Sequence, residues 1–341
     1  MKIGTVRVII CVEAVVSIVF CVVVQPYWLT AVFILSACKS LDCEVYGLKE
    51  LEYRKIDAFT SFNSLGNPAA CVYLNGGQTL TEDEMLNIAK QHKGFVSEVV
   101  YCTDKSGSDF DLVYYSSECE VPFCGHGTIA CMYSLIKSSP ELLKLKQITI
   151  HTRTKGSLAI YNEIAKWDVI YISAPEPIHK IVPTSIEIIA ENLGVDKTVI
   201  SAEYPVDFID AGNKTLIVPI KTLDDEISIF PNEQALKDFT LNNGIDVILI
   251  YCKDVSDGAC FAHTRVFAAK YGYLEDPATG SANSAFGYYM LKNNMWSGHP
   301  ITLEQGGIDR VFNTVNLSYN ENDRLLFGGK AYTRIKGIYY I

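Results

Sequence analysis

The sequence predicts an α+β protein in which two similar domains follow a hydrophobic leader. From residue 51 onward, short apolar stretches alternate with polar turns, and few segments are long enough for a helix. Two helix-length segments are apolar on almost every face, and each follows a strand-like stretch and a turn of small residues. The chain has 341 residues, 49% of them hydrophobic, a length that favours two domains over one.

Residues 1–50 differ in character from the rest of the chain. Residues 8–24 (VIICVEAVVSIVFCVVV) are almost entirely apolar and follow two basic residues, and a second apolar run covers residues 29–38. A basic start before an apolar stretch predicts a secretory signal or a membrane anchor. A start site placed too far upstream explains the leader equally well. We therefore expect contact with a membrane, or secretion, only through these residues.

Charge and cysteine usage narrow the function classes. The net charge of −10 argues against a nucleic-acid partner, which requires a basic face. Of the 11 cysteines, four lie in the first fifty residues, and the others are scattered without metal-ligand spacing. They are typical of buried thiols in a reducing compartment, so we expect the catalytic part in the cytoplasm. No phosphate-binding loop, dinucleotide fingerprint or zinc-peptidase motif is present, and no cofactor or metal is expected.

The first elements after the leader follow from local signals. Thr81 and Glu84 form a capping box that predicts a helix to about Lys93. The valine-rich residues 95–102 predict a strand, and residues 110–115 predict the next one after a polar turn.

The two small-residue turns look alike. Residues 124–128 (CGHGT) lead into one apolar helix, and residues 278–282 (ATGSA) lead into the other. Aligned on their glycines, residues 124–126 lie over residues 279–281, which predicts a duplicated fold. A helix start offers unpaired N–H groups and a positive dipole end, so two starts facing one cleft would hold a carboxylate. The alternative interpretation is that glycine at these turns only permits close helix packing.

Three side chains are candidates for proton transfer. Glu98 lies within the predicted valine-rich strand, on the same face as Val96 and Val100. A carboxylate there is either solvated at a sheet edge or enclosed in a pocket that raises its pKa towards neutrality. His126 and Asp276 lie at the two turns, although an Asp before Pro is also a common loop starter.

Five motifs in order resemble the PhzF-like isomerase family of the diaminopimelate epimerase superfamily. They are residues 56–70 with IDAFT and GNPAA, 97–98 (SE), 120–126 (EVPFCGH), 275–282 (EDPATGSA) and 304–306 (EQG). The resemblance covers essentially all of residues 51–341.

The resemblance implies a fold of two domains, each a strongly bent β-sheet or barrel around a central helix. We expect the first domain to span residues 51–163, joined by a C-terminal strand at 326–341, and the second to span residues 164–325. It also implies an active site between the domains and a homodimer.

For the site, the resemblance implies that Glu98 is the general acid/base. The residues implied to bind substrate are His126, Gly125, Asp276, Ser281, Gly280, Thr279, Cys124 and Asn67. Epimerase relatives use two cysteines at the helix starts, where this chain has Cys124 and Thr279. A two-cysteine mechanism is therefore disfavoured.

The function predicted is a cofactor-independent isomerase in which Glu98 moves a proton on a small carboxylate-bearing substrate. Burial is expected to raise the pKa of Glu98 towards neutrality, as a shuttling acid/base requires. One alternative is a catalytically silent module that binds a small molecule or a protein, since fold alone does not fix chemistry. Another is a racemase or dehydratase that uses Cys124 and Thr279. Two departures from the family pattern, Val99 after Glu98 and the lack of Arg and Pro in residues 113–117, bear on the substrate.

Overall fold

The computed structural model describes residues 48–61, 63–307, 310–320 and 324–341, and Leu51–Tyr339 form one compact unit. The signal, anchor or artefact predicted for residues 1–50 lies, up to residue 47, outside the described residues. Within the described part of the chain, no helix is both long and apolar enough to cross a membrane.

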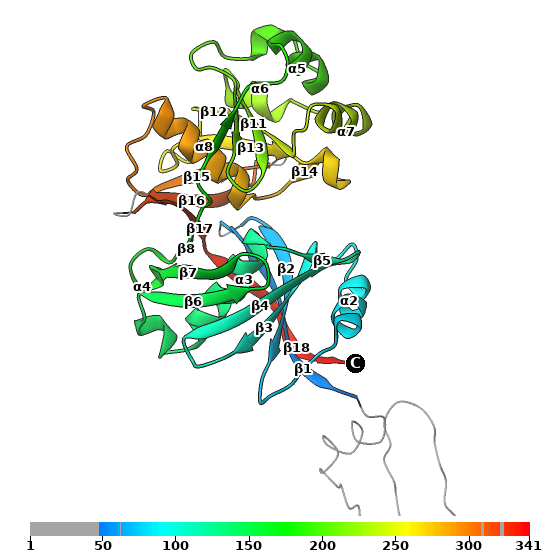
Figure 1. Cartoon of the computed structure of the whole chain (residues 1–341). Coiled ribbons are helices and arrows are strands. Elements are labelled where there is room, and N and C mark those ends of the chain that lie inside the picture. The colour runs from blue at the N-terminus through cyan, green and yellow to red at the C-terminus, as the bar shows by residue number, and fades with distance from the viewer. Residues whose placement is uncertain (1–47, 62, 308–309, 321–323) are drawn as a thin grey trace, which may run out of the picture. The chain divides into compact units, whose positions relative to one another are not determined.

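Helices and strands alternate irregularly along the chain (Figure 1). The α-helices described are α2 (Glu82–Gln91), α3 (Gly125–Ser138), α4 (Ile164–Trp167), α5 (Ile186–Leu193), α6 (Leu223–Ile227), α7 (Glu233–Asn242) and α8 (Gly280–Lys292). The strands of the first half are β1 (Glu50–Ala58), β2 (Asn67–Leu74), β3 (Glu98–Asp104), β4 (Asp109–Ser116), β5 (Glu120–Val121), β6 (Gln147–Thr152), β7 (Gly156–Asn162), β8 (Ile170–Ser173) and β9 (Ile178–Lys180). Those of the second half are β10 (Asp207–Asp210), β11 (Lys214–Pro219), β12 (Val247–Cys252), β13 (His263–Phe267), β14 (Glu275–Asp276), β15 (Ile301–Gln305), β16 (Asn313–Tyr319), β17 (Leu325–Gly329) and β18 (Ala331–Tyr340).

The strand pairings of the first half recur in the second half. β2 and β3 pair in parallel, β3 and β4 antiparallel, and β4 also pairs with the short β5 and, in parallel, with β6. The strands β11 to β15 repeat this arrangement one for one. The antiparallel run β6–β7–β8 is matched by β15–β16–β17. The α+β class and the internal duplication expected from the two turns are therefore confirmed.

Each copy has a central helix (Figure 1). α3 packs against β2 and β3, and α8 packs against β10, β12, β16 and β17. Most residues of both helices are buried, as expected from segments without a polar face. On the outside of the copies, α2 packs on β3 and β4, and α5 and α7 enclose a second apolar core with β10 to β13.

The division into domains at residues 163/164 and 325/326 stays a prediction. β8 pairs with β7 on one side and with β17 on the other. This pairing joins the two copies into a single hydrogen-bonded network of strands.

The capping box of α2 forms as predicted, but the strand after it begins later. The Glu84 amide donates to Thr81 Oγ1 at 3.2 Å, and the Thr81 amide donates to Glu84 Oε2 at 2.8 Å. The helix end is followed by further turns, in which Val96 N donates to the His92 carbonyl at 3.2 Å. The strand predicted from residue 95 therefore starts at Glu98, and Val96 lies outside it. Glu98 is thus the first residue of β3, where it pairs with Ala69 of β2 and Ser116 of β4.

Candidate active site

The two turns predicted from the sequence meet at one aromatic ring. Cys124 and Thr279 are the N-caps of α3 and α8, with nearly equal backbone angles (φ −127°, ψ 110° and φ −127°, ψ 104°). A Cβ added to Gly125 would lie 3.4 Å from the Phe327 ring, and one added to Gly280 would lie 2.4 Å from it. The interpretation that glycine permits close packing therefore holds at Gly280, and both helix starts are brought to one place.

Glu98, Cys124 and His126 form a cluster at the start of α3. His126 Nε2 lies 3.2 Å from Glu98 Oε2. Cys124 Sγ lies 3.7 Å from the same oxygen and 3.5 Å from His126 Nδ1. The Gly127 amide donates to Cys124 Sγ at 3.2 Å, which caps the helix with sulfur. The ligand atoms of the three side chains lie within 4.8 Å of one another, close enough to hold a metal, but each already has a partner inside the cluster.

The charge state of this cluster differs from the one expected. Burial by itself raises the pKa of Glu98, but the His126 and Cys124 contacts outweigh it and lower that pKa. Burial would lower the pKa of His126, yet Cys124 and Glu98 raise it well above the usual value. Burial raises the pKa of Cys124. The prediction of a raised Glu98 pKa was wrong, because an imidazolium faces the carboxylate beside a neutral thiol.

The carboxyl group whose pKa is raised is that of Asp276, a residue just before the second turn. Burial raises the pKa of Asp276 to about 6; His126 opposes the shift and Glu98 adds to it. Asn67 Nδ2 donates to Asp276 Oδ1 at 2.9 Å, and the Thr279 hydroxyl donates to Oδ2. Asn67 Nδ2 also donates to the Ala278 carbonyl at 2.9 Å, so a side chain of β2 holds the turn before α8. The pKa values of Glu98 and Asp276 are thus pushed in opposite directions.

Gln305 in β15 fixes the Thr279 turn, a role that the sequence did not indicate. The Thr279 amide donates to Gln305 Oε1 at 2.9 Å, and Gln305 Nε2 donates to the Asp276 carbonyl at 3.0 Å. Asn283 Nδ2 donates to the same Oε1 at 2.6 Å. Gln305 is fully buried, so these bonds are protected from water. Its signal in the sequence was its place in the EQG motif.

Two further residues complete the surroundings of the second turn. Ser281 Oγ accepts a hydrogen bond from Asn213 Nδ2 at 2.7 Å. Tyr273 was missed by the sequence reasoning. Burial, and then the charges of Asp276 and Glu98, raise the pKa of its hydroxyl. The charges of both carboxylates therefore act on this hydroxyl.

Arg265, which lies in β13, is held by hydrogen bonds to other residues of the protein. Its Nε and Nη2 donate to the Glu275 carboxylate at 3.0 and 2.8 Å. Its Nη1 donates to the carbonyls of Glu226 and Ile229 at 2.7 and 2.8 Å. Only 1% of the residue is exposed, so this guanidinium braces β13 and β14 and is not free to bind an anion.

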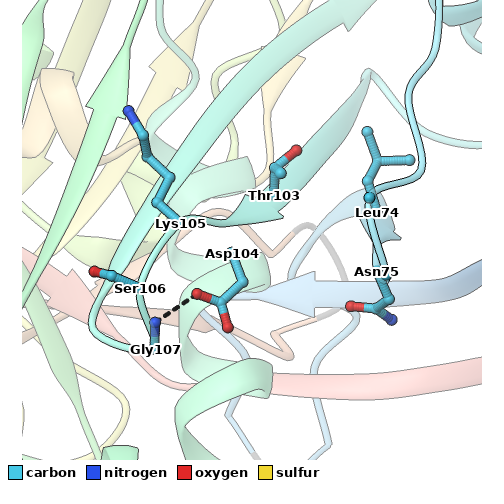
Figure 2. Close-up of a pocket in the computed structure, with 9 residues that line it drawn as sticks. Leu74, Asn75, Thr103, Asp104, Lys105, Ser106 and Gly107 are labelled. Carbon is cyan, nitrogen blue, oxygen red and sulfur yellow. Dashed lines mark hydrogen bonds between the residues drawn. The ribbon is translucent and has the colours of Figure 1, made fainter.

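A separate cavity of about 380 Å³ lies away from these groups (Figure 2). It is lined by residues 74–77 and 103–107, at the opposite end of β3 from Glu98. Asp104 is turned towards Gly107 and accepts a hydrogen bond from its amide at 2.6 Å (Figure 2). It contains none of the site residues predicted from the sequence.

Comparison with known proteins agrees with the motifs. The family model for phenazine biosynthesis-like proteins matches residues 56–337. An uncharacterized isomerase, YfhB of Bacillus subtilis, is 29% identical over 263 residues, covering 76% of this chain and 87% of that protein. The trans-2,3-dihydro-3-hydroxyanthranilate isomerase of Pseudomonas fluorescens is 25% identical over 268 residues, covering 74% of this chain and 85% of that protein.

Solved structures show the same fold. The PhzF-family protein of Bacillus anthracis superposes with a TM-score of 0.73 at 27% identity, covering 86% of this chain and all of that one. A probable proline racemase from Agrobacterium radiobacter, 10% identical with a TM-score of 0.52 over 84% of this chain and 92% of that one, shares the fold alone. With a family model that spans most of the chain, the duplicated sheet and the order of the motifs, the chain belongs to the PhzC-PhzF family of phenazine biosynthesis-like proteins.

Proposed function

We propose that the protein is a proton-shuttling isomerase in which Glu98 is the general acid/base for a small carboxylate-bearing substrate. The observation that carries this proposal is the pair of acids with opposite pKa shifts. The pKa of Glu98 is lowered and that of Asp276 is raised to about 6, so near neutral pH one is a base and the other holds a proton more readily. Relatives in B. subtilis and P. fluorescens are named isomerases, which supports the same reaction class.

The substrate carboxylate would be held at the two helix starts. In each helix the first N–H groups, at Gly125 and His126 and at Gly280 and Ser281, have no acceptor inside the helix. The two N-termini also add their positive dipole ends. Because the Arg265 guanidinium is occupied by Glu275, these amides supply the anion site of the second turn.

Glu98 would then take a proton from a substrate carbon and return it elsewhere on the skeleton. The His126 imidazolium, whose Nε2 lies 3.2 Å from Glu98 Oε2, keeps Glu98 ionised before the reaction. When Glu98 carries the substrate proton, the positive charge of His126 favours its release to the next carbon. Asn67 and Thr279 orient the Asp276 carboxyl by hydrogen bonds to its two oxygens.

A cysteine-based racemase is less well supported. Burial raises the pKa of Cys124, which keeps the thiol protonated, whereas a nucleophilic or basic cysteine needs a thiolate. The Thr279 hydroxyl is already donated to Asp276.

The test is deuterium exchange in D₂O, followed by NMR, with small amino and hydroxy acids as candidate substrates. The wild type is compared with Glu98→Gln and with Cys124→Ser. Exchange into a carbon position that is lost in Glu98→Gln and kept in Cys124→Ser supports the proposal. Exchange lost in Cys124→Ser and kept in Glu98→Gln supports the racemase instead. Saturable binding of a compound without exchange identifies a binding module.

A further inference from the structure

A second cluster of ligating side chains lies inside the second copy of the fold. It consists of Glu226 in α6, Cys252 at the end of β12 and His263 at the start of β13, and their ligand atoms all lie within 4.8 Å of one another. Cys252 and His263 are direct partners across the β12–β13 pairing. The exposed fractions of Glu226, Cys252 and His263 are 0%, 1% and 0%. The family motifs include none of the three.

Hydrogen bonding leaves the centre of this cluster unsatisfied. His263 Nε2 lies 2.9 Å from the Gly306 carbonyl, and because a carbonyl only accepts, Nε2 carries the hydrogen. His263 Nδ1 faces Glu226 Oε1 at 3.2 Å without the alignment of a hydrogen bond. Among the described residues, neither Glu226 oxygen nor His263 Nδ1 has a hydrogen-bond partner. The Cys252 thiol donates away from the cluster, to the Asp254 carbonyl at 3.2 Å.

Such an arrangement is costly unless something lies between the side chains. A buried carboxylate without hydrogen bonds loses its hydration, and here only a charge on His263 Nδ1, 3.2 Å away, would offset that loss. A proton on His263 Nδ1 would supply charge, but it would leave the second carboxylate oxygen unpartnered. A divalent cation in the centre would satisfy the carboxylate, the imidazole nitrogen and the sulfur together.

The identity of the three ligands selects the kind of cation. One nitrogen, one sulfur and one carboxylate form a set typical of Zn²⁺, which is borderline soft and accepts all three. His263 presents a lone pair at Nδ1 while its other nitrogen donates to a backbone carbonyl, the usual second contact of a metal-bound histidine.

We propose that Glu226, Cys252 and His263 form a buried structural zinc site. Metal binding would release the Cys252 thiol proton, since the thiolate is the ligand. The second oxygen of Glu226 or one water molecule completes the tetrahedron. The zinc site would support the candidate active site through two adjacent residues. His263 donates to the Gly306 carbonyl, and the preceding residue, Gln305, accepts from the Thr279 amide.

The test uses the full-length protein without a histidine tag, stripped with a chelator and titrated with Co²⁺ as the probe. We expect one Co²⁺ per chain, a near-ultraviolet band from thiolate-to-cobalt charge transfer, and displacement by Zn²⁺. Zinc should also raise the unfolding temperature of the stripped protein, since only the folded chain assembles the ligands. Cys252→Ser should lose the band and at least ~10-fold in affinity, the scale of even outer-sphere changes.

The matched control is Cys124→Ser, which removes the cysteine of the other cluster. It should keep the band and the stoichiometry. If the band disappears in Cys124→Ser and survives in Cys252→Ser, the metal belongs to the Glu98 cluster and the proposal is overturned. If the folded wild type binds no Co²⁺, the cluster is a buried histidine–glutamate ion pair. Should Cys252→Ser fail to fold, the wild-type titration and the control variant still decide, and neither depends on the proposed isomerase activity.

Discussion

The two glycines at the helix starts look equivalent in the sequence, but the structure predicts different costs for replacing them. In Gly280→Ala the new Cβ would lie 2.4 and 2.5 Å from two carbons of the Phe327 ring, whereas in Gly125→Ala it would lie 3.4 Å from that ring. Carbon atoms normally approach to about 3.5–4.0 Å, so the first variant overlaps the ring by about 1 Å and the second barely touches it.

The size of the difference follows from two opposing terms. Overpacking a buried site costs about 1–3 kcal/mol. Alanine favours the helix over glycine by about 0.5–1 kcal/mol, and this gain applies to both variants. Because the helix gain is common to both variants, we expect Gly280→Ala to be about 1–3 kcal/mol less stable than Gly125→Ala, which should be neutral or stabilised by less than about 1 kcal/mol.

Urea unfolding followed by circular dichroism measures both changes. Adding Phe327→Leu to each variant is the control, since a smaller side chain should relieve Gly280→Ala and merely remove packing in Gly125→Ala. Equal stability of the two single variants, or a larger loss in Gly125→Ala, would refute the packing of both turns on one ring.

Four other substitutions probe the site. Gln305→Ala leaves the Thr279 amide without its buried acceptor and should lower the free energy of unfolding in urea by about 1–3 kcal/mol. A loss below about 0.5 kcal/mol would contradict the role of Gln305 in fixing the Thr279 turn. The raised pKa of Asp276 means that its neutral form favours the folded state. The wild type should therefore lose about 1–3 kcal/mol of unfolding free energy relative to Asp276→Asn as the pH rises from about 4 through 6. Parallel pH profiles of the two proteins would disprove this assignment. The lowered pKa of Glu98 acts in the opposite sense. Ionised Glu98 stabilises the fold above the pKa that the residue has in the unfolded chain, and this stabilisation is lost as acid protonates the carboxylate. Glu98→Gln should therefore flatten the acid side of the plot of stability against pH, and an unchanged acid side would count against the ion pair with His126. Tyr273→Phe should leave the free energy of unfolding within about 0.5 kcal/mol of the wild type, because 43% of the residue is exposed; a larger loss in urea unfolding would contradict this.

Much of the architecture could be predicted because its signals are local. The capping box of Thr81 and Glu84 lies within one helical turn, and the apolar faces of α3 and α8 lie within single segments. The duplication could be inferred because each copy places a glycine, Gly125 or Gly280, at the start of a single apolar helix, and this pattern lies within a short stretch of sequence.

The electrostatics of the site could not be predicted, because they depend on side chains brought together by the fold. A carboxylate in an apolar stretch suggested a raised pKa for Glu98, but His126, from another element, reverses the sign. The same holds for Gln305 and for the Glu226 cluster, whose members come from α6, β12 and β13 without a recognisable spacing. The homodimer, the cytoplasmic location, the lack of a nucleic-acid partner and the domain boundaries stay predictions.

The central claim is that Glu98 carries the proton, and isotope transfer to carbon tests it most directly. Once a substrate has been found, the wild type and Glu98→Gln are compared in D₂O by the rate at which deuterium enters the product carbon, with folding of the variant confirmed by circular dichroism. We expect the variant to lose at least ~10²-fold in this rate, the usual contribution of a general acid/base, while binding the substrate comparably. A folded Glu98→Gln variant that incorporates deuterium at the wild-type rate would contradict the account.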